Sequence, residues 1–296
     1  MSTTTDHSQL ASPASNGFCI VSPASGSTFQ IAAGSVWPSI RFDTNAVLKQ
    51  GDQLHWNWRL SWRTWSKAGT QTTDTSFWKT GSTFASCGGK LDVTVAGPHG
   101  SASASVKLLG SSIPEADITA YLARKLNNSG FERILRHETR MMHFDKGEPL
   151  VSGDLGYGIC QLTNPKPTFE QCWDWKLNID AGLSLFAEKQ RIAQHYLSQQ
   201  GRSFTVEQLE RETIARWNGG PYHVWSTKQN CWIRNPDILC DSCTNNIGWN
   251  LRDTRNAGKT EAQLHERDKA KFKRVPKEDD VWFYSGVCYA DRILNS

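Results

Sequence analysis

The feature that most constrains the fold is a change in hydrophobic periodicity near residue 113. In the segment QLHWNWRLSW, apolar and polar residues alternate, which places Leu54, Trp56, Trp58, Leu60 and Trp62 on one face of a strand. The segments 91–95 and 102–108 repeat this alternation. From Pro114 onward, apolar residues instead recur every three or four positions, as in amphipathic helices. The chain therefore combines a β part with a helical part, which predicts an α+β protein of more than one domain.

We expect residues 1–17 to form a flexible polar tail and residues 18–112 to form an immunoglobulin-like β-sandwich. The tryptophan row could stack on sugars, but any half-buried strand also needs one apolar face for the core. Residues 113–296 are expected to form a mainly helical domain, with helices at about 178–200 and 206–217. Residues 226–280 are polar and poorly periodic, which indicates either a long loop or an inserted subdomain.

The charge balance argues against a nucleic-acid partner, and the distribution of apolar residues argues against a membrane span. The chain has 33 Lys and Arg against 29 Asp and Glu, a net charge of only +4. A nucleic-acid binder usually carries a dense basic patch, so no nucleic-acid partner is expected. No run of about 18 apolar residues is present, so no membrane span is expected either.

Eight cysteines, an even number, suit disulfides in an oxidising compartment. Cys19 and Cys87 stand alone in the first third of the chain and are the most natural pair. Buried thiols remain the alternative for several of the others. A zinc site is a further alternative. It would use Cys231, Cys240, Cys243 and Cys288, although only one CxxC pair is present.

Glu138 interrupts an apolar helix face. Phe131, Ile134 and Leu135 follow helical spacing, and the next position of that stripe is Glu138. Such a carboxylate is either paired for structural reasons or functional. Burial without a partner raises a carboxyl pKa and provides a proton donor near neutral pH.

Four further motifs follow Glu138 in order. They are Gly158–Gln161 within SGDLGYGICQLTNP, the segment NIDAG at 178–182, Trp217-Asn218 within ARWNGG, and Tyr289 within YADRIL. Together with Glu138, this order resembles the lytic transglycosylase family, whose catalytic domain is lysozyme-like. The resemblance covers about residues 114–225 and the last dozen residues. Thr139 and Trp217 replace the usual Ser and Tyr, and Cys160, where Met is common, could bridge to Cys172.

The resemblance implies an enzyme that cleaves peptidoglycan without a cofactor or a metal. Protonated Glu138 would donate to the glycosidic oxygen between N-acetylmuramic acid and N-acetylglucosamine. Its carboxylate would then accept the proton of the muramyl 6-hydroxyl as a 1,6-anhydro ring closes. Gln161, Asn218 and Tyr289 would hold the N-acetyl groups and orient Glu138, and Gly158 and Trp217 would complete the substrate site.

Two other functions and one exclusion follow from the same residues. A hydrolytic muramidase, like goose-type lysozyme, would need a second carboxylate about 6.5–9.5 Å away, for which Asp145 and Asp154 are the nearest candidates in sequence. A non-catalytic wall-binding protein would keep the fold alone. A zinc protease is excluded because His137 and His143 are six residues apart, about 240° around a helix.

Cell-wall chemistry implies action in the periplasm, yet the first residues lack the basic and apolar regions of a secretory signal. We therefore expect export by another route. The preferred hypothesis is an antibacterial effector delivered by machinery such as type VI secretion, with a cognate immunity protein in the producer. Delivery by a phage is the alternative.

Overall fold

The computed structural model describes residues 17–98, 100–125 and 130–295, and it divides into two compact units. The first unit contains the described residues up to Ala32 together with Val36–Gly110. The second contains Ala33–Ser35 and the chain from Ser111 onward. Residues 1–16 of the expected tail lie outside the described residues. The first unit is built of strands and the second is mainly helical, so the chain is an α+β protein as predicted.

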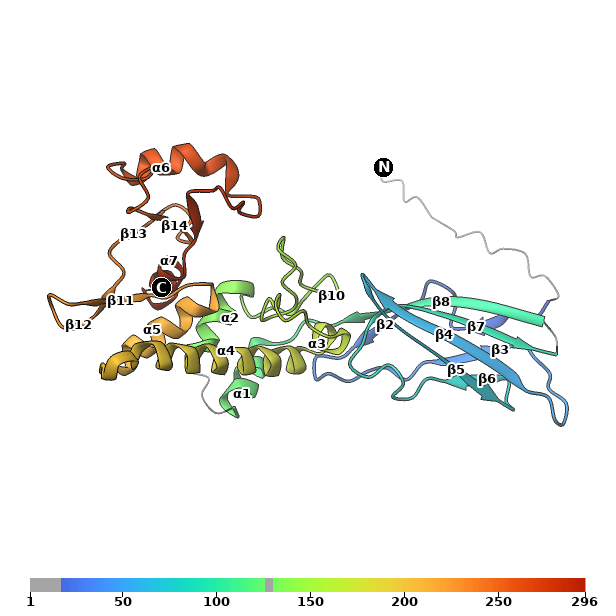
Figure 1. Cartoon of the computed structure of the whole chain (residues 1–296). Helices are drawn as coiled ribbons and strands as arrows, with labels where there is room; N and C mark the ends of the chain where they lie inside the picture. Colours follow the sequence, from blue (N-terminus) through green and yellow to red (C-terminus); the bar gives the residue numbers. More distant parts are fainter. Residues whose placement is uncertain (1–16, 99, 126–129, 296) are drawn as a thin grey trace, which may run out of the picture. The chain divides into compact units, whose positions relative to one another are not determined.

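The first unit consists of two sheets (Figure 1). Its strands are β1 (Ile20–Ser22), β2 (Thr28–Ile31), β3 (Arg41–Thr44), β4 (Leu54–Trp62), β5 (Trp65–Thr73), β6 (Phe77–Lys79), β7 (Gly89–Gly97) and β8 (Gly100–Gly110). The strand orders are β1-β3-β6 and β2-β8-β7-β4-β5. The pairs are antiparallel except that of β2 with β8.

The alternation predicted for β4 is confirmed. Leu54, Trp56 and Leu60 have no exposed surface, while His55 and Asn57 on the other face are exposed. The ring of Trp56 lies 6.0 Å from that of Trp78 in the other sheet, so the two sheets share a core. The tryptophan row thus serves mainly the packing of the sheets.

The predicted Cys19–Cys87 disulfide is wrong. Cys19 is an exposed thiol beside β1, whereas the side chain of Cys87 is enclosed in the core. A disulfide needs both sulfur atoms in one place, and these two residues occupy different environments.

The second unit contains seven helices among its described residues, two short 3-10 helices, and short strands. The helices are α1 (Glu115–Ala123), α2 (Phe131–Thr139), α3 (Phe169–Trp173), α4 (Trp175–Leu197), α5 (Val206–Trp217), α6 (Glu261–Asp268) and α7 (Gly286–Asn295), with η1 at Gln199–Gly201 and η2 at Lys269–Lys271. The strands are β9 (Phe144–Asp145), β10 (Glu148–Pro149), β11 (His223–Ser226), β12 (Cys231–Arg234), β13 (Ile238–Cys240), β14 (Ile247–Asn250) and β15 (Trp282–Tyr284). The helices predicted at 178–200 and 206–217 are α4 and α5. None of the helices in the described ranges is long and apolar enough to cross a membrane.

Helices α2, α4, α5 and α7 surround one hydrophobic core. The stripe predicted on α2 is buried, since Phe131, Ile134 and Leu135 have no exposed surface. Gly286 allows α7 to begin against the end of α5. A Cβ at this position would lie 2.3 Å from the carbonyl oxygen of Ala215, a distance that no side chain tolerates. Helix α7 therefore starts close to the turn that follows α5.

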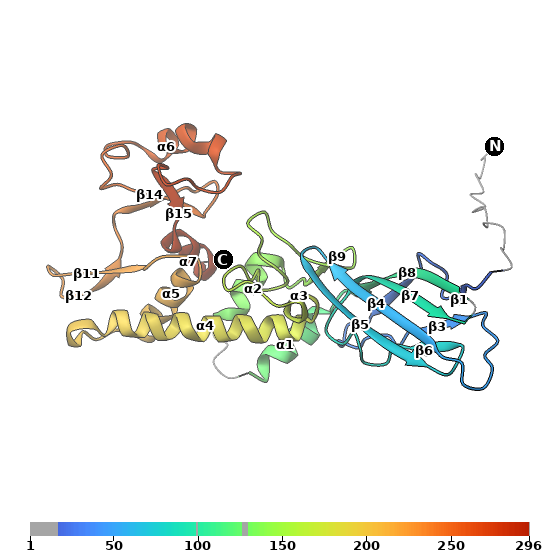
Figure 2. The ribbon, with the colours of Figure 1, turned by 45° about the vertical axis from the view of Figure 1, so that its right-hand side comes forward.

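Residues 226–280, predicted to be either a long loop or an inserted subdomain, contain short strands and a helix. We use the name inserted subdomain for residues 236–285. Strands β13, β14 and β15 form an antiparallel sheet, and α6 lies beside it (Figure 2). Ile247, Trp249, Leu264 and Trp282 form a small core of its own. The indole of Trp249 donates a hydrogen bond of 2.9 Å to Asp268, which links this core to the end of α6.

One disulfide connects this subdomain to α7. Cys240 at the end of β13 is bonded to Cys288, with a Cα–Cα distance of 5.5 Å. The four-cysteine zinc site considered from the sequence is therefore wrong, because two of its ligands are consumed. Cys231 and Cys243 are exposed thiols.

Candidate active-site cleft

Glu138 lies in the last turn of α2. The helix ends directly afterward, because Arg140 and Met141 adopt left-handed backbone angles with φ of 54° and 60°. The hydroxyl of Thr139 donates to the carbonyl oxygens of Leu135 and Ile159, which fixes this turn. The C-terminus of a helix carries a partial negative charge, so this position disfavours an ionised carboxylate.

Glu138 lines a cleft with a volume of about 740 Å³, which is within the range of volumes typical of ligand sites. The cleft collects residues from five parts of the second unit: α2, the loop after Ser152, the turn after α5, the inserted subdomain and α7. They are His137, Glu138, Gly153, Asp154, Asn218, Asn246, Phe272, Lys273, Arg274, Val275, Pro276, Tyr284 and Tyr289.

Glu138 is an exposed residue, but the protein around its carboxyl removes part of its hydration. This environment raises the pKa of Glu138 above its usual value, and the negative charge of Asp154 adds to the effect. A hydrogen bond of 2.5 Å from the hydroxyl of Tyr289 and the positive charge of Arg292 act in the opposite direction without reversing it. Glu138 thus keeps its proton to a higher pH than an ordinary glutamate.

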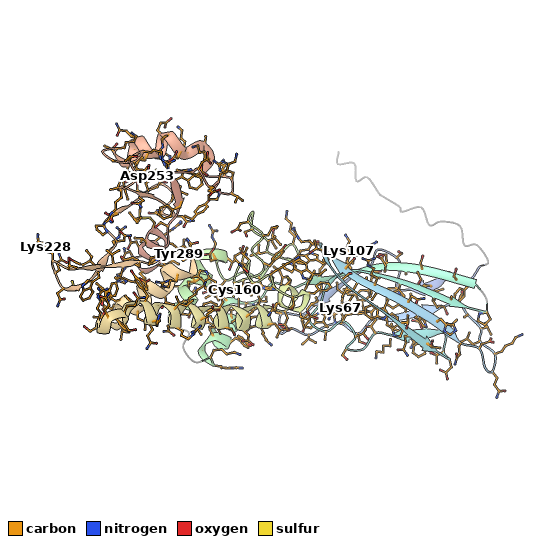
Figure 3. All side chains as sticks on the ribbon, in the orientation of Figure 1. Lys67, Lys107, Cys160, Lys228, Asp253 and Tyr289 are labelled. Carbon is orange, nitrogen blue, oxygen red and sulfur yellow. A yellow bond between two sulfur atoms is a disulfide. The ribbon has the colours of Figure 1, made fainter. Side chains whose placement is uncertain are left out.

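Tyr289, which α7 carries (Figure 3), is itself held in its protonated form. Its side chain is almost fully enclosed, and burial together with the neighbouring carboxylate raises its pKa well above 10. Its hydroxyl therefore remains a hydrogen-bond donor to Oε1 of Glu138 through the physiological pH range. The disulfide at Cys288, the preceding residue, anchors this part of α7.

Two amides form another part of the cleft. Asn218 follows the last residue of α5, and its Nδ2 donates a 2.9 Å hydrogen bond to Oδ1 of Asn246 in the inserted subdomain. Both residues line the cleft. Amide side chains offer donors and acceptors together, which suits recognition of N-acetyl and hydroxyl groups.

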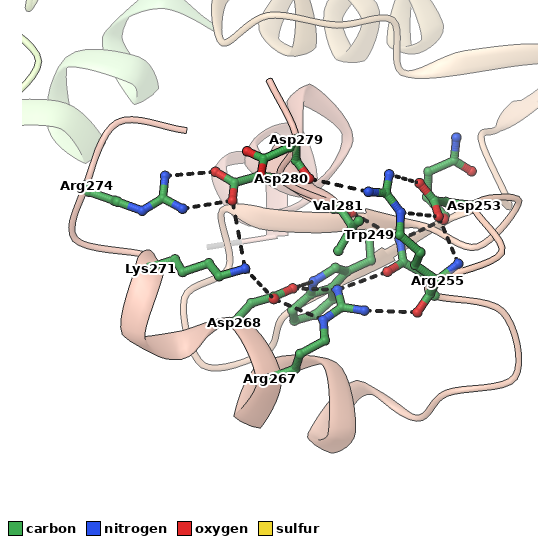
Figure 4. Close-up of polar contacts among 12 residues, drawn as sticks. Trp249, Asp253, Arg255, Arg267, Asp268, Lys271, Arg274, Asp279, Asp280 and Val281 are labelled. Carbon is green, nitrogen blue, oxygen red and sulfur yellow. Dashed lines mark hydrogen bonds and ion pairs between the residues drawn. The ribbon is translucent and has the colours of Figure 1, made fainter. Parts of the chain in front are cut away.

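The inserted subdomain supplies one wall through residues 272–276. Figure 4 shows the polar network behind it. Arg274 donates two hydrogen bonds of 2.9 and 2.8 Å to Asp280, and Asp268 accepts from both Arg267 and the indole of Trp249. Such paired bonds fix geometry as well as charge, so this wall is held in place by its own subdomain.

Three residues predicted to contact substrate do not line the cleft. The side-chain amide of Gln161 donates to the carbonyl oxygen of Gly158 at 2.7 Å. Gly158 is buried with φ of 72°, and a Cβ there would lie 2.5 Å from the amide of Asn178. Trp217 packs between Phe131 and the core of α4. These residues build the support of the cleft, so the structure does not bring them to the substrate side.

The NIDAG motif has the same supporting role. Asn178 has no exposed surface, and its side chain accepts from the amide of Cys160 and donates to the carbonyl oxygen of Tyr157. The sulfur of Cys160 lies against Gly182 on α4 (Figure 3), and burial raises the pKa of this thiol well above 9. The predicted Cys160–Cys172 bridge is therefore wrong, since Cys160 carries a buried thiol packed against α4.

His143 completes this support. It is buried, its Nδ1 accepts from the amide of Ile159 at 3.1 Å, and its Nε2 donates to the carbonyl oxygen of Cys172 at 2.9 Å. Burial lowers its pKa to about 3, so the ring is neutral. Both nitrogens are engaged with the backbone, far from the role of a metal ligand.

The two carboxylates considered as a second acid, Asp145 and Asp154, lie in different places. Asp154 lines the cleft with Glu138 and accepts a hydrogen bond from Ser152, whereas Asp145 is exposed on β9 and is not among the residues lining the cleft. Sequence reasoning did not identify Asn246, Tyr284 or the wall at 272–276. Asn246 and the wall belong to the poorly periodic region 226–280, and Tyr284 follows it directly, so no local signal pointed to these residues.

Comparisons with known proteins do not extend these observations. The chain matches no family model, no curated protein and no solved structure. Any functional assignment therefore depends on the chemistry of the cleft.

Proposed function

We propose that this chain cleaves the β-1,4 bond between N-acetylmuramic acid and N-acetylglucosamine in peptidoglycan, with Glu138 as the catalytic acid. The observation that carries the proposal is the carboxyl of Glu138, with its raised pKa, in a cleft that also holds Tyr289 and Asn218. These three residues come from positions 138, 218 and 289, as the motif order of lytic transglycosylases requires. A carboxyl group with a raised pKa in a polar cleft is the proton donor that this chemistry needs.

In the proposed reaction, Glu138 donates its proton to the glycosidic oxygen as the bond to the muramyl C1 breaks. The resulting carboxylate then accepts the proton of the muramyl 6-hydroxyl while that oxygen bonds to C1. The product is a 1,6-anhydro ring, and Glu138 regains its proton. Tyr289 donates to the carboxylate between the two steps, and Asn218 with Asn246 offers amide groups to the substrate.

Hydrolysis is the second candidate, because Asp154 lines the same cleft as Glu138. In that reaction Asp154 would accept a proton from water, which attacks C1 in place of the 6-hydroxyl. Analysis of products by mass spectrometry separates the two reactions. Anhydromuropeptides identify the lyase and reducing muramyl ends identify the hydrolase. Asp154→Asn would abolish only the second activity.

The test of the proposal is digestion of purified peptidoglycan by the full chain and by Glu138→Gln. We expect the wild type to release soluble muropeptides and the variant to release far fewer. Asp145→Asn is the matched control, because this carboxylate is exposed and lies away from the lining of the cleft. Equal release by wild type and Glu138→Gln would refute the role of Glu138. Binding of peptidoglycan without release by either protein would favour a non-catalytic wall-binding role.

We also propose that the protein acts in the periplasm, as a delivered antibacterial effector neutralised by an immunity protein, or as a phage-delivered enzyme. The Cys240–Cys288 disulfide supports an oxidising site of action. Expression in bacteria with and without a fused secretory leader tests this compartment. Growth arrest only with the leader would support it, and equal arrest without the leader would contradict it.

A further inference from the structure

A cluster of three potential metal ligands lies in the inserted subdomain, outside the proposed catalytic machinery. It consists of Asp241, Cys243 and His265, whose donor atoms all lie within 4.8 Å of one another. Asp241 and Cys243 belong to the loop between β13 and β14, and His265 belongs to α6. We propose that these three side chains bind one Zn²⁺ ion.

The donor set favours zinc over other common cations. A thiolate, an imidazole and a carboxylate are all frequent zinc ligands, whereas magnesium and calcium prefer oxygen atoms alone. A tetrahedral zinc ion keeps its ligand atoms about 3.3–3.8 Å apart, given bonds of roughly 2.0–2.3 Å. Nδ1 of His265 is 2.9 Å from Oδ1 of Asp241, so small side-chain rotations would admit the ion. Three protein ligands leave the fourth position to water.

The loop presents its two ligands in a fixed conformation. The amide of Thr244 donates to Oδ2 of Asp241 at 3.1 Å, and the amide of Asn245 donates to the carbonyl oxygen of Asp241 at 2.7 Å. These bonds orient the carboxylate so that Oδ1 faces His265. Outer bonds of this kind commonly hold the ligands of metal sites in position.

Accessibility also fits a site that takes an ion from solution. Asp241 has no exposed surface, His265 is partly exposed, and Cys243 is an exposed thiol. The cluster therefore has an enclosed anionic side and an open side.

The proposed ion would join the loop between β13 and β14 to α6, and through α6 it would act on one wall of the cleft. The ring of His265 packs edge-on against Phe272, with a centroid distance of 5.5 Å. Phe272 is a lining residue of the cleft. Zinc would thus stiffen α6 and the adjoining wall. The proposal itself does not depend on what the cleft cleaves.

The test uses the full chain, stripped with a chelator under non-reducing conditions that preserve Cys240–Cys288. Titration with Zn²⁺ alone, followed by calorimetry, should show one ion bound per chain, and zinc should raise the thermal midpoint. Cys243→Ser and His265→Gln should each weaken binding at least about tenfold. Cys231→Ser is the matched control, because it removes another exposed thiol of the same unit. It should bind zinc as the wild type does.

A spectroscopic measurement identifies the ligand directly. Co²⁺ in place of zinc should give a thiolate charge-transfer band in the wild type and in Cys231→Ser, but not in Cys243→Ser. Absence of stoichiometric zinc binding would overturn the proposal and leave Asp241 and His265 as a structural pair. Unchanged binding in Cys243→Ser, or a thiolate band lost only in Cys231→Ser, would also overturn it. Neither readout depends on peptidoglycan cleavage.

Discussion

Two glutamates on helices of the second unit have contrasting surroundings. Glu212 on α5 has no exposed surface, and its Oε2 accepts from the amides of Tyr222 and His223 and from the ring of His223, each at 3.0 Å. Its Oε1 pairs with Arg216 at 2.9 Å. Within the described part of the chain, Glu138 accepts a hydrogen bond only from Tyr289, and the rest of its carboxyl faces the cleft.

The two carboxylates differ in how many hydrogen-bond and ion-pair partners they have. We infer that this number, more than burial, distinguishes a structural carboxylate from one that can react. Three hydrogen bonds to Oε2 and the ion pair with Arg216 use the carboxylate of Glu212 to hold the turn after α5. The hydrogen bond from Tyr289 does not offset the partial loss of hydration at Glu138, so the pKa of Glu138 stays above its usual value. Substitutions at the two sites should therefore affect different properties.

Glu138→Gln should reduce peptidoglycan cleavage by on the order of 10²–10⁴-fold, the usual contribution of a general acid. The free energy of unfolding should change by less than about 0.5 kcal/mol, because glutamine can still accept the bond from Tyr289. Muropeptide release and urea denaturation of the same preparations measure both. A large loss of stability would place Glu138 in the same class as Glu212.

Glu212→Ala should have the opposite profile. Removing the carboxylate leaves Arg216 and the two amides without their partner, which should reduce the free energy of unfolding by about 3–5 kcal/mol. Urea denaturation checks this value. Glu207→Ala is the control, since Glu207 is exposed in the first turn of the same helix and should change stability by less than about 1 kcal/mol. Equal effects of the two substitutions would contradict the interpretation.

His143 is another buried titratable residue, and it is neutral in the folded chain. Its contribution to the free energy of unfolding should therefore depend on pH. The unfolded chain binds a proton at this imidazole below about pH 6.5, whereas burial lowers the pKa in the folded chain to about 3. The unfolded state thus binds more protons in this interval, and stability falls as the pH decreases. The expected slope from this residue is about 1.4 kcal/mol per pH unit.

Unfolding experiments between pH 7 and pH 4 measure the slope, with His143→Gln as the comparison. The variant should be less stable at pH 7, but its stability should fall less steeply with acid. Parallel curves would show that His143 does not carry this pH dependence.

Tyr289→Phe should have the smallest effect and should sharpen the description of Glu138. The hydroxyl stabilises the carboxylate, so its removal raises the pKa of Glu138 further. An acid catalyst stops working when it loses its proton, and the alkaline limb of the pH–activity profile should therefore move to higher pH. Tyr284→Phe is the control, because its hydroxyl donates instead to the carbonyl oxygen of Phe272. A shift to lower pH in Tyr289→Phe would contradict this arrangement.

Sequence periodicity correctly predicted the elements that have one buried face and one exposed face. The alternation along β4 and the helical stripe on α2 identified buried residues correctly, because one face of each element contacts a core. The same stripe identified Glu138 as an exception. The inserted subdomain gave no such signal, because its core draws one or two residues each from short elements far apart in sequence, such as Trp249, Leu264 and Trp282.

Motif order predicted the neighbourhood of the cleft better than the role of each residue. Asn218 and Tyr289 line the cleft with Glu138, whereas Gln161 and Trp217 lie in its support. A motif indicates that residues share a local structure, but the direction of each side chain depends on tertiary packing. The cysteine pairing failed for the same reason, since Cys240 and Cys288 meet only after β13 and α7 have packed.

The close start of α7 at Gly286 has a consequence for how this protein can change. Because the backbone of Ala215 occupies the space where any side chain would go, even alanine would force the helix outward. Tyr289 lies three residues further along and would move with it, lengthening the 2.5 Å contact that lowers the pKa of Glu138. A side chain at position 286 would therefore disturb the contact between Tyr289 and Glu138, so we expect this position to accept only glycine.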